Sequence, residues 1–201
     1  MLPLRLLATL AGALIAGLSL ATIAAARFDE DGPLAGNREL AFGAGAFGPG
    51  CWQTHSGPFC TPNNYTARLL AVRHGIAGSA SGEFQRRNHV NGGSLGGRVT
   101  CMAVAGNRAA IGGFLAEKTS AQPGFDVGDP FLFYVEDNGP IVASTPDRIS
   151  GLAVLPEGDP DLAFVPDAFP WVCPSADSIY GYMPLSSGDI TVGDAAVRAD
   201  G

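Results

Sequence analysis

The chain has 201 residues, with 12 Lys and Arg against 19 Asp and Glu, a formal net charge of −7. A surface this acidic repels nucleic acid and anionic lipid, so neither is expected as a partner. A hydrophobic content of 46% excludes a disordered chain, while 28 Gly and 15 Pro indicate many turns and short elements. We therefore expect a turn-rich, mostly β globular protein.

The N-terminal residues 1–26 have the pattern of a secretory signal. Arg5 precedes an uncharged run from Leu6 to Ala26, which ends in an Ala-x-Ala cleavage site. The run is long enough to cross a bilayer. However, it is rich in Ala and Gly, and acidic residues follow it where an anchor would have a basic stop-transfer cluster. We predict cleavage after Ala26, a secreted or periplasmic protein, and no membrane association of the mature chain.

Residues 27–64 are predicted to form a Gly-rich N-terminal extension that includes a Cys51–Cys60 loop. The stretch 41–50 is Gly-rich but lacks the Gly-Lys-Ser/Thr of a phosphate-binding loop. We therefore expect it to be a flexible or extended lead-in rather than a site.

Four cysteines in an exported chain indicate disulfides. Cys51 and Cys60 bracket a short loop that closes at low entropic cost, so we predict that they pair. Cys101 and Cys173 then pair by elimination. Because no C-x-x-C occurs and the three His are scattered, we expect no zinc or other metal and no cofactor.

Short strands separated by turn signals follow, so residues 65–201 are predicted to be an all-β domain, a small antiparallel sandwich or barrel. The clearest unit is a hairpin over 98–115 that turns at Gly106-Asn107, two residues able to take positive φ between β-prone runs. Gly112-Gly113 in its second arm predicts a bulge or a close backbone approach. The other expected strands are 66–73, 81–87, 131–135, 147–154 and 188–192. The strand 131–135 is fully apolar, so we expect it to be buried on both sides or to lie at the centre of a sheet. A Pro- and Asp-rich loop is expected at 156–178.

Several of these segments resemble the post-COAP-1-type domain of secreted bacterial proteins, over about residues 66–198. The resemblance implies a compact all-β module without an assigned activity. The chain departs from the usual pattern at 141–145 and in a long insert at 156–178. The segments that carry the resemblance are Ser81–Phe84, Arg98–Cys101, Val104–Gly113, Phe133–Gly139, Asp147–Ser150 and Ser187–Val192.

Two groups of carboxylates are candidate sites. The acidic stretch 157–167 could bind calcium, but the EF-hand spacing is absent, so we expect a solvated loop. Asp137 and Asp147 could converge at one end of the sheet, although Asp137 is expected mainly to cap its turn.

No catalytic residue is predicted. The chain has no Gly-x-Ser-x-Gly elbow. Glu83 and Glu117 could form the carboxylate pair of a sugar-cleaving enzyme, but the sequence does not place them together.

Aromatic residues near the cysteines are the predicted binding residues, because exposed aromatics on crosslinked loops stack on sugars or contact proteins. The alternative is that they cover the open ends of the sheet. The predicted function is a secreted, non-catalytic binding or structural module, whose partner is a protein or glycan of the cell envelope. The alternative is a secreted hydrolase acting on polysaccharide. The aromatic candidates are Trp52, Phe169, Trp171, Tyr180 and Tyr182.

Overall fold

The structure is a computed structural model that describes residues 38–54, 57–74, 79–119, 124–140, 145–157, 159, 163, 165–177 and 181–194. The chain divides into two units, Met1–Pro33 and Leu34–Gly201, and every described residue belongs to the second. The predicted signal segment and its cleavage site lie outside the described residues. Within the ranges described, no helix has the length and apolarity needed to cross a membrane.

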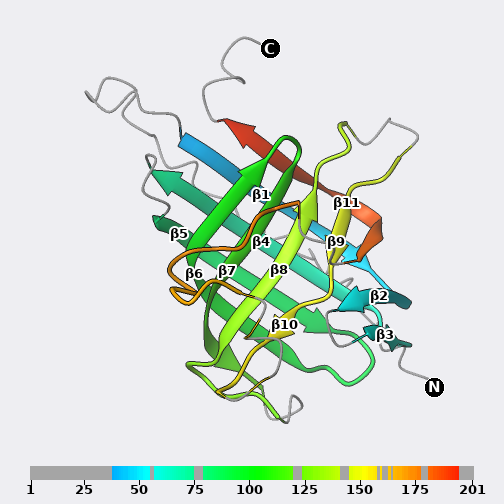
Figure 1. Ribbon diagram of the computed structural model, residues 1–201. Helices are drawn as coiled ribbons and strands as arrows, with labels where there is room; N and C mark the ends of the chain where they lie inside the picture. Colours follow the sequence, from blue (N-terminus) through cyan, green and yellow to red (C-terminus); the bar gives the residue numbers. More distant parts are fainter. Residues whose placement is uncertain are drawn as a thin grey trace, which may run out of the picture. The chain divides into compact units, whose positions relative to one another are not determined.

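The described part of the chain is an eight-stranded antiparallel closed barrel with the order β8-β7-β6-β5-β4-β1-β11-β9 (Figure 1). The short strand β9 closes it by pairing with both β8 and β11. A separate two-stranded sheet, β2-β3, lies between β1 and β4 in sequence, and β10 extends the pairing along β8. The strands are β1 (Arg38–Phe47), β2 (Gly50–Thr54), β3 (Gly57–Thr61), β4 (Tyr65–His74), β5 (Ser79–Asn88), β6 (Ser94–Ala105), β7 (Arg108–Lys118), β8 (Pro130–Glu136), β9 (Arg148–Ser150), β10 (Ala153–Val154) and β11 (Tyr182–Asp194).

The predicted all-β class is confirmed, and the fold is the barrel rather than the sandwich. The β6–β7 hairpin turns at Gly106-Asn107, because Ala105 pairs with Arg108. The apolar strand β8 is buried on both faces, as its sequence predicts. Both disulfides also form as predicted, with Cα–Cα separations of 4.0 Å for Cys51–Cys60 and 5.3 Å for Cys101–Cys173.

The boundary predicted between residues 64 and 65 is wrong, because β1 is a full strand of the barrel wall. It pairs along its length with β4 and β11. Its glycines permit close packing rather than flexibility. A Cβ on Gly43 would lie 2.2 Å from the carbonyl oxygen of Asp189, and one on Gly45 would lie 2.6 Å from the Leu185 side chain.

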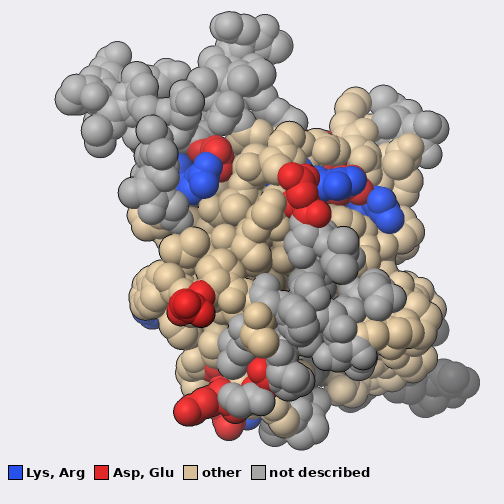
Figure 2. Space-filling view, viewed as in Figure 1, with Lys and Arg blue, Asp and Glu red and all other residues tan. Residues whose placement is uncertain are grey.

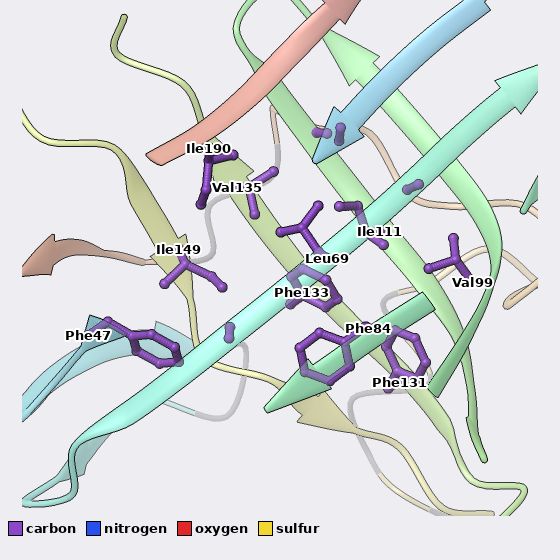
Figure 3. Close-up of a cluster of buried hydrophobic side chains, with 14 of the residues drawn as sticks. Phe47, Leu69, Phe84, Val99, Ile111, Phe131, Phe133, Val135, Ile149 and Ile190 are labelled. Carbon is purple, nitrogen blue, oxygen red and sulfur yellow. The ribbon is translucent and has the colours of Figure 1, made fainter. Parts of the chain in front are cut away.

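The barrel interior is filled by apolar side chains (Figure 3). Three of the largest fully buried side chains pack together: the ring centroid of Phe84 lies 5.5 Å from that of Phe131 and 4.7 Å from that of Phe133. An eight-stranded barrel is just wide enough either for its own side chains or for one small ligand. Because side chains take that space here, a ligand is better accommodated on the outer surface.

A second apolar cluster lies outside the barrel wall, beneath the described residues of the stretch 155–177 (155–157, 159, 163 and 165–177), which we call the covering segment. Leu132 and Tyr134 of β8 and Ala110 of β7 pack there against Leu155 and Ala176. Figure 1 shows the orange part of this segment crossing in front of β6 and β7. The outer residues of β8 are therefore buried by the loop rather than by a second sheet.

A bulge in β6 attaches the covering segment to the wall. The register shifts between Val99 and Cys101, so Thr100 and Cys101 both face outward. The Thr100 hydroxyl donates to the Pro170 carbonyl oxygen at 2.6 Å, and Cys101 forms the disulfide with Cys173. Gly113, opposite the bulge, has Arg98 O only 1.9 Å from the position of a Cβ. The close backbone approach, one of the two alternatives predicted at Gly112-Gly113, is thus present, whereas the bulged residue lies opposite it in β6, the first arm of the hairpin.

Candidate functional site

The candidate site is a groove on the outer face of β4, β5, β6 and the end of β7. Alternation along these strands places Thr66 and Arg68 of β4 on the same face as Gln85 and Arg87 of β5. Thr66 lies opposite Arg87, and Arg68 lies opposite Gln85. Gly96 of β6 lies between Gln85 and Glu117 of β7.

This outer groove has a volume of about 610 Å³, which is within the usual range for ligand sites. Polar side chains dominate it, and hydroxyl, amide and guanidinium groups all face the same space. The Thr66 hydroxyl is hydrogen-bonded to Nε2 of His89 at 3.1 Å. The groove is lined by Thr66, Ala67, Arg68, Gln85, Arg86, Arg87, His89, Gly92, Ser94, Leu95, Glu117 and Thr119.

The cations of the groove differ from the other described cations. Arg73, Arg108, Lys118 and Arg148 each form an ion pair with a carboxylate. On the face drawn in Figure 2, basic and acidic side chains accordingly lie side by side in small mixed groups. In the described part of the chain, Arg68, Arg86, Arg87 and Arg98 form no ion pair. Among the arginines whose side chains the structure describes, those without an ion pair thus lie on three adjacent strands, β4, β5 and β6.

Arg86 differs from its neighbours because its side chain lies on the inner face of β5. Its guanidinium carbon is 4.9 Å from the centroid of the Tyr65 ring. Burial lowers the pKa of Arg86 to about 10, and the charge of Tyr65 acts in the opposite direction. Arg86 therefore remains a cation at neutral pH and adds positive charge beneath the groove.

A smaller hollow of about 200 Å³ continues the groove along the strands and shares Gln85 and Glu117 with it. Glu83 and Arg98 line its far side. Gly96 leaves room for the Glu117 side chain, since a Cβ there would lie 2.5 Å from Oε1. The structure thus brings Glu83 and Glu117 to one hollow, and both side chains are exposed.

Trp171 lies at the far end of this surface. Its ring centroid is 5.5 Å from that of Phe114, in an edge-on arrangement, and Phe114 pairs with Arg98 in the sheet register. The Trp171 side chain is 62% exposed. Its neighbours are fixed, because Pro170 accepts the Thr100 hydrogen bond and Cys173 is crosslinked. Trp171 is therefore an exposed indole on an anchored backbone.

The other predicted aromatic residues have different surroundings. Phe169 is half-buried in the outer cluster, where a Cβ on Gly112 would lie 2.7 Å from its ring. Tyr182 packs against the same cluster, with Arg108 and Arg148 5.7 and 5.4 Å from its ring centroid. The Trp52 side chain and Tyr180 lie outside the described residues.

The acidic candidates also have defined places where the structure describes them. Asp137 accepts a hydrogen bond from Gly139 N at 2.8 Å, the predicted turn cap, and another from Val192 N at 3.0 Å. Asp147 accepts from Ile190 N at 2.7 Å. Asp137 and Asp147 therefore do converge, on β11. Among the residues described, no group of three or more His, Cys, Asp or Glu could hold a metal ion.

Sequence reasoning missed Arg68, Gln85 and Arg87. A signal for them was present, because β4 and β5 follow one another and alternate with period two. Residues of alternating polarity on two consecutive strands face outward together. No such local signal shows that Glu117 of β7 lies near the residues of β5, because β6 separates the two strands.

Comparison with known proteins gave no match to any protein-family model, to any curated protein or to any solved structure.

Proposed function

We propose that this protein is a secreted, non-catalytic module that binds a glycan of the cell envelope or medium. The ligand lies on the outer face of β4–β7, with Trp171 stacking on a sugar ring at one end. The observation that carries the proposal is the 62% exposure of a Trp171 side chain whose neighbours are bonded to the barrel wall. Aromatic rings combine a large apolar face with low conformational entropy, which suits stacking on the C–H face of a sugar.

Two further features support the location and the ligand class. Two disulfides indicate an oxidising extracellular or periplasmic environment, as the signal pattern predicts. Thr66, Gln85, Ser94 and Thr119 supply donors and acceptors suited to sugar hydroxyls. An open, polar surface with an aromatic platform accommodates part of a long chain better than a small apolar molecule.

The experiment is a titration of the exported protein with a panel of envelope and extracellular oligosaccharides. We expect Trp171→Ala to weaken binding by about 1–3 kcal/mol, an amount typical of an interface aromatic. Val172→Ala is the matched control, because Val172 is adjacent in sequence and 48% exposed. Equal binding by both variants and the unchanged protein would exclude Trp171 from the site.

A secreted hydrolase is the second candidate, favoured by the hollow that Glu83 and Glu117 both line. A glycosidase general acid is normally kept protonated by apolar surroundings, whereas both of these side chains are exposed. Release of reducing ends from a bound oligosaccharide, abolished by Glu117→Gln, would favour the hydrolase. Binding without cleavage favours the module.

A further inference from the structure

The arginines of the outer groove define the chemical class of the ligand more narrowly. Thr66 lies directly opposite Arg87, so Arg68 and Arg87 are diagonal neighbours on adjacent antiparallel strands. The Cα atoms of residues in this relation are about 7–8 Å apart. Two guanidinium groups attached at such neighbouring positions, without a carboxylate partner among the described residues, repel each other. An anion that bridges them would remove this cost and gain charge-assisted hydrogen bonds.

Acidic side chains limit how far the positive charge extends along the strands. Arg87 pairs with Ser94, and Arg98 lies four residues further along β6, about 13 Å away. Arg98 is directly opposite Glu83 in the register, and both line the smaller hollow together with Glu117. The groove cations that face no carboxylate across the described strand pair are therefore Arg68 and Arg87, which lie opposite Gln85 and Thr66.

The residues that line the groove favour a sugar chain over a peptide as the ligand. In the described sheet the barrel is closed, and β5 and β6 are paired on both sides, so a peptide has no free strand edge to extend. The groups left to a ligand are side-chain hydroxyls, the Gln85 amide and guanidinium groups. These groups suit ring hydroxyls together with carboxylates or sulfates.

We infer that the outer groove binds an acidic glycan, with Arg68 and Arg87 paired to its carboxylate or sulfate groups; this inference rests on the proposed glycan-binding function. Glu117, the only carboxylate among the groove-lining residues that the structure describes, lies at the β7 side and excludes acidic groups there. The bound chain accordingly places its charged groups over β4 and β5 and its uncharged face toward Trp171.

The test uses isothermal titration of the exported protein with four probes. Oligogalacturonate carries carboxylates, its methyl ester is the same chain without charge, and dextran sulfate and dextran form the second pair. We expect an acidic probe to bind and its neutral counterpart to bind at least roughly tenfold more weakly, since each arginine contributes a charge-assisted bond. Comparison of the affinities for oligogalacturonate and dextran sulfate shows whether the groove prefers carboxylates or sulfates.

Variants locate the site. Arg68→Gln and Arg87→Gln are each expected to weaken acidic-probe binding by roughly tenfold or more. Arg148→Gln is the matched control, because it removes the same charge from a side chain that is 40% exposed and leaves Glu136 paired with Arg108. Its effect is expected to stay within about twofold, as for charges distant from a site.

The outcomes separate the two proposals. If the neutral and acidic probes bind equally and only Trp171→Ala weakens binding, the acidic-glycan inference fails and the glycan-binding function stands. If Arg148→Gln weakens binding as much as Arg68→Gln does, the acidic probe is attracted by the protein's positive charges in general, and the groove is not the site. If no probe or oligosaccharide binds, both proposals fail.

Discussion

Among the described residues, Glu136 is a carboxylate that forms ion pairs with two arginines. It lies at the outer end of β8, where Arg108 of β7 donates to Oε1 at 2.8 Å and Arg148 of β9 donates to Oε2 at 3.1 Å. Burial raises its pKa, but the bond and charge of Arg108, followed by those of Arg148, outweigh burial and leave the pKa lowered. The ring of Tyr182 lies against both guanidinium groups.

This lowered pKa predicts a pH-dependent contribution to stability. A carboxyl group whose pKa is lower in the folded state stabilises the protein above its unfolded pKa, and the contribution is lost as the pH falls through the folded pKa. We expect Glu136→Gln to lower the free energy of unfolding at pH 7. The difference from the unchanged protein should shrink below the ordinary carboxyl range, as measured by urea unfolding at a series of pH values. A difference that is constant with pH would contradict the assignment.

Gly113 provides a second test at the scale of one residue. A Cβ there would meet backbone, Arg98 O at 1.9 Å, which cannot move without disturbing β6. We expect Gly113→Ala to cost about 1–3 kcal/mol of unfolding free energy, as overpacking does. Gly193→Ala in β11 is the control, because nothing lies within 4 Å of its Cβ position. Equal thermal midpoints for the two variants would show that the wall relaxes around the methyl group.

At the scale of elements, the two disulfides connect different parts of the fold. Cys101–Cys173 spans 72 residues and attaches the covering segment to β6, whereas Cys51–Cys60 spans 9 residues and joins the paired strands β2 and β3. In the chain-entropy description, their removal costs about 4 and about 2.5 kcal/mol. We expect the Cys101→Ser, Cys173→Ser double variant to be less stable in guanidinium unfolding than the Cys51→Ser, Cys60→Ser double variant. It should also show faster hydrogen exchange at β7 and β8. The opposite order of stability would mean that the covering segment contributes little to the barrel.

The same elements show which sequence signals are sufficient. The Gly106-Asn107 hairpin was predictable, because the turn residues and both strands are local. Strand β1 was not, because the glycines at 43 and 45 that let β11 approach closely look the same in sequence as glycines of a flexible lead-in. Only the core of β11 was predicted. The register against β1 shifts near Ser187 and breaks the period-two pattern in the first half of the strand.

At the scale of the whole molecule, the candidate site depends on four strands that the barrel brings together, β4, β5, β6 and β7. The sequence named Glu83 and Glu117 as candidates without placing them together, and most of the aromatic residues as a group near Cys173. It could not show that Arg98 pairs with Phe114, the ring that supports Trp171. The link between the polar groove and the aromatic platform is a property of strand register. Register across β6 and β7 depends on two irregularities, and the one between Gly96 and Gly97 has no local motif that predicts it.

The last prediction concerns closure of the barrel. This closure depends on side-chain hydrogen bonds as well as on strand pairing. On its β11 side, β9 pairs in the described sheet only with the three residues Tyr182–Pro184. Further along the seam, Asp147 accepts from Ile190 N through one carboxylate oxygen, at 2.7 Å, and from Asn138 N through the other, at 2.8 Å. An Asn side chain has one oxygen and cannot accept both bonds.

We therefore expect Asp147→Asn to leave one of these two N–H groups without its acceptor and to cost about 1–3 kcal/mol of unfolding free energy. Hydrogen exchange should accelerate at the amides of Ile190 and Asn138, on the two sides of the seam, before it does so at β5 and β6. Asp167→Asn, at an exposed position in the covering segment, is the control for loss of one negative charge. If both variants unfold and exchange alike, backbone pairing alone closes the barrel, and the carboxylate contributes only its charge.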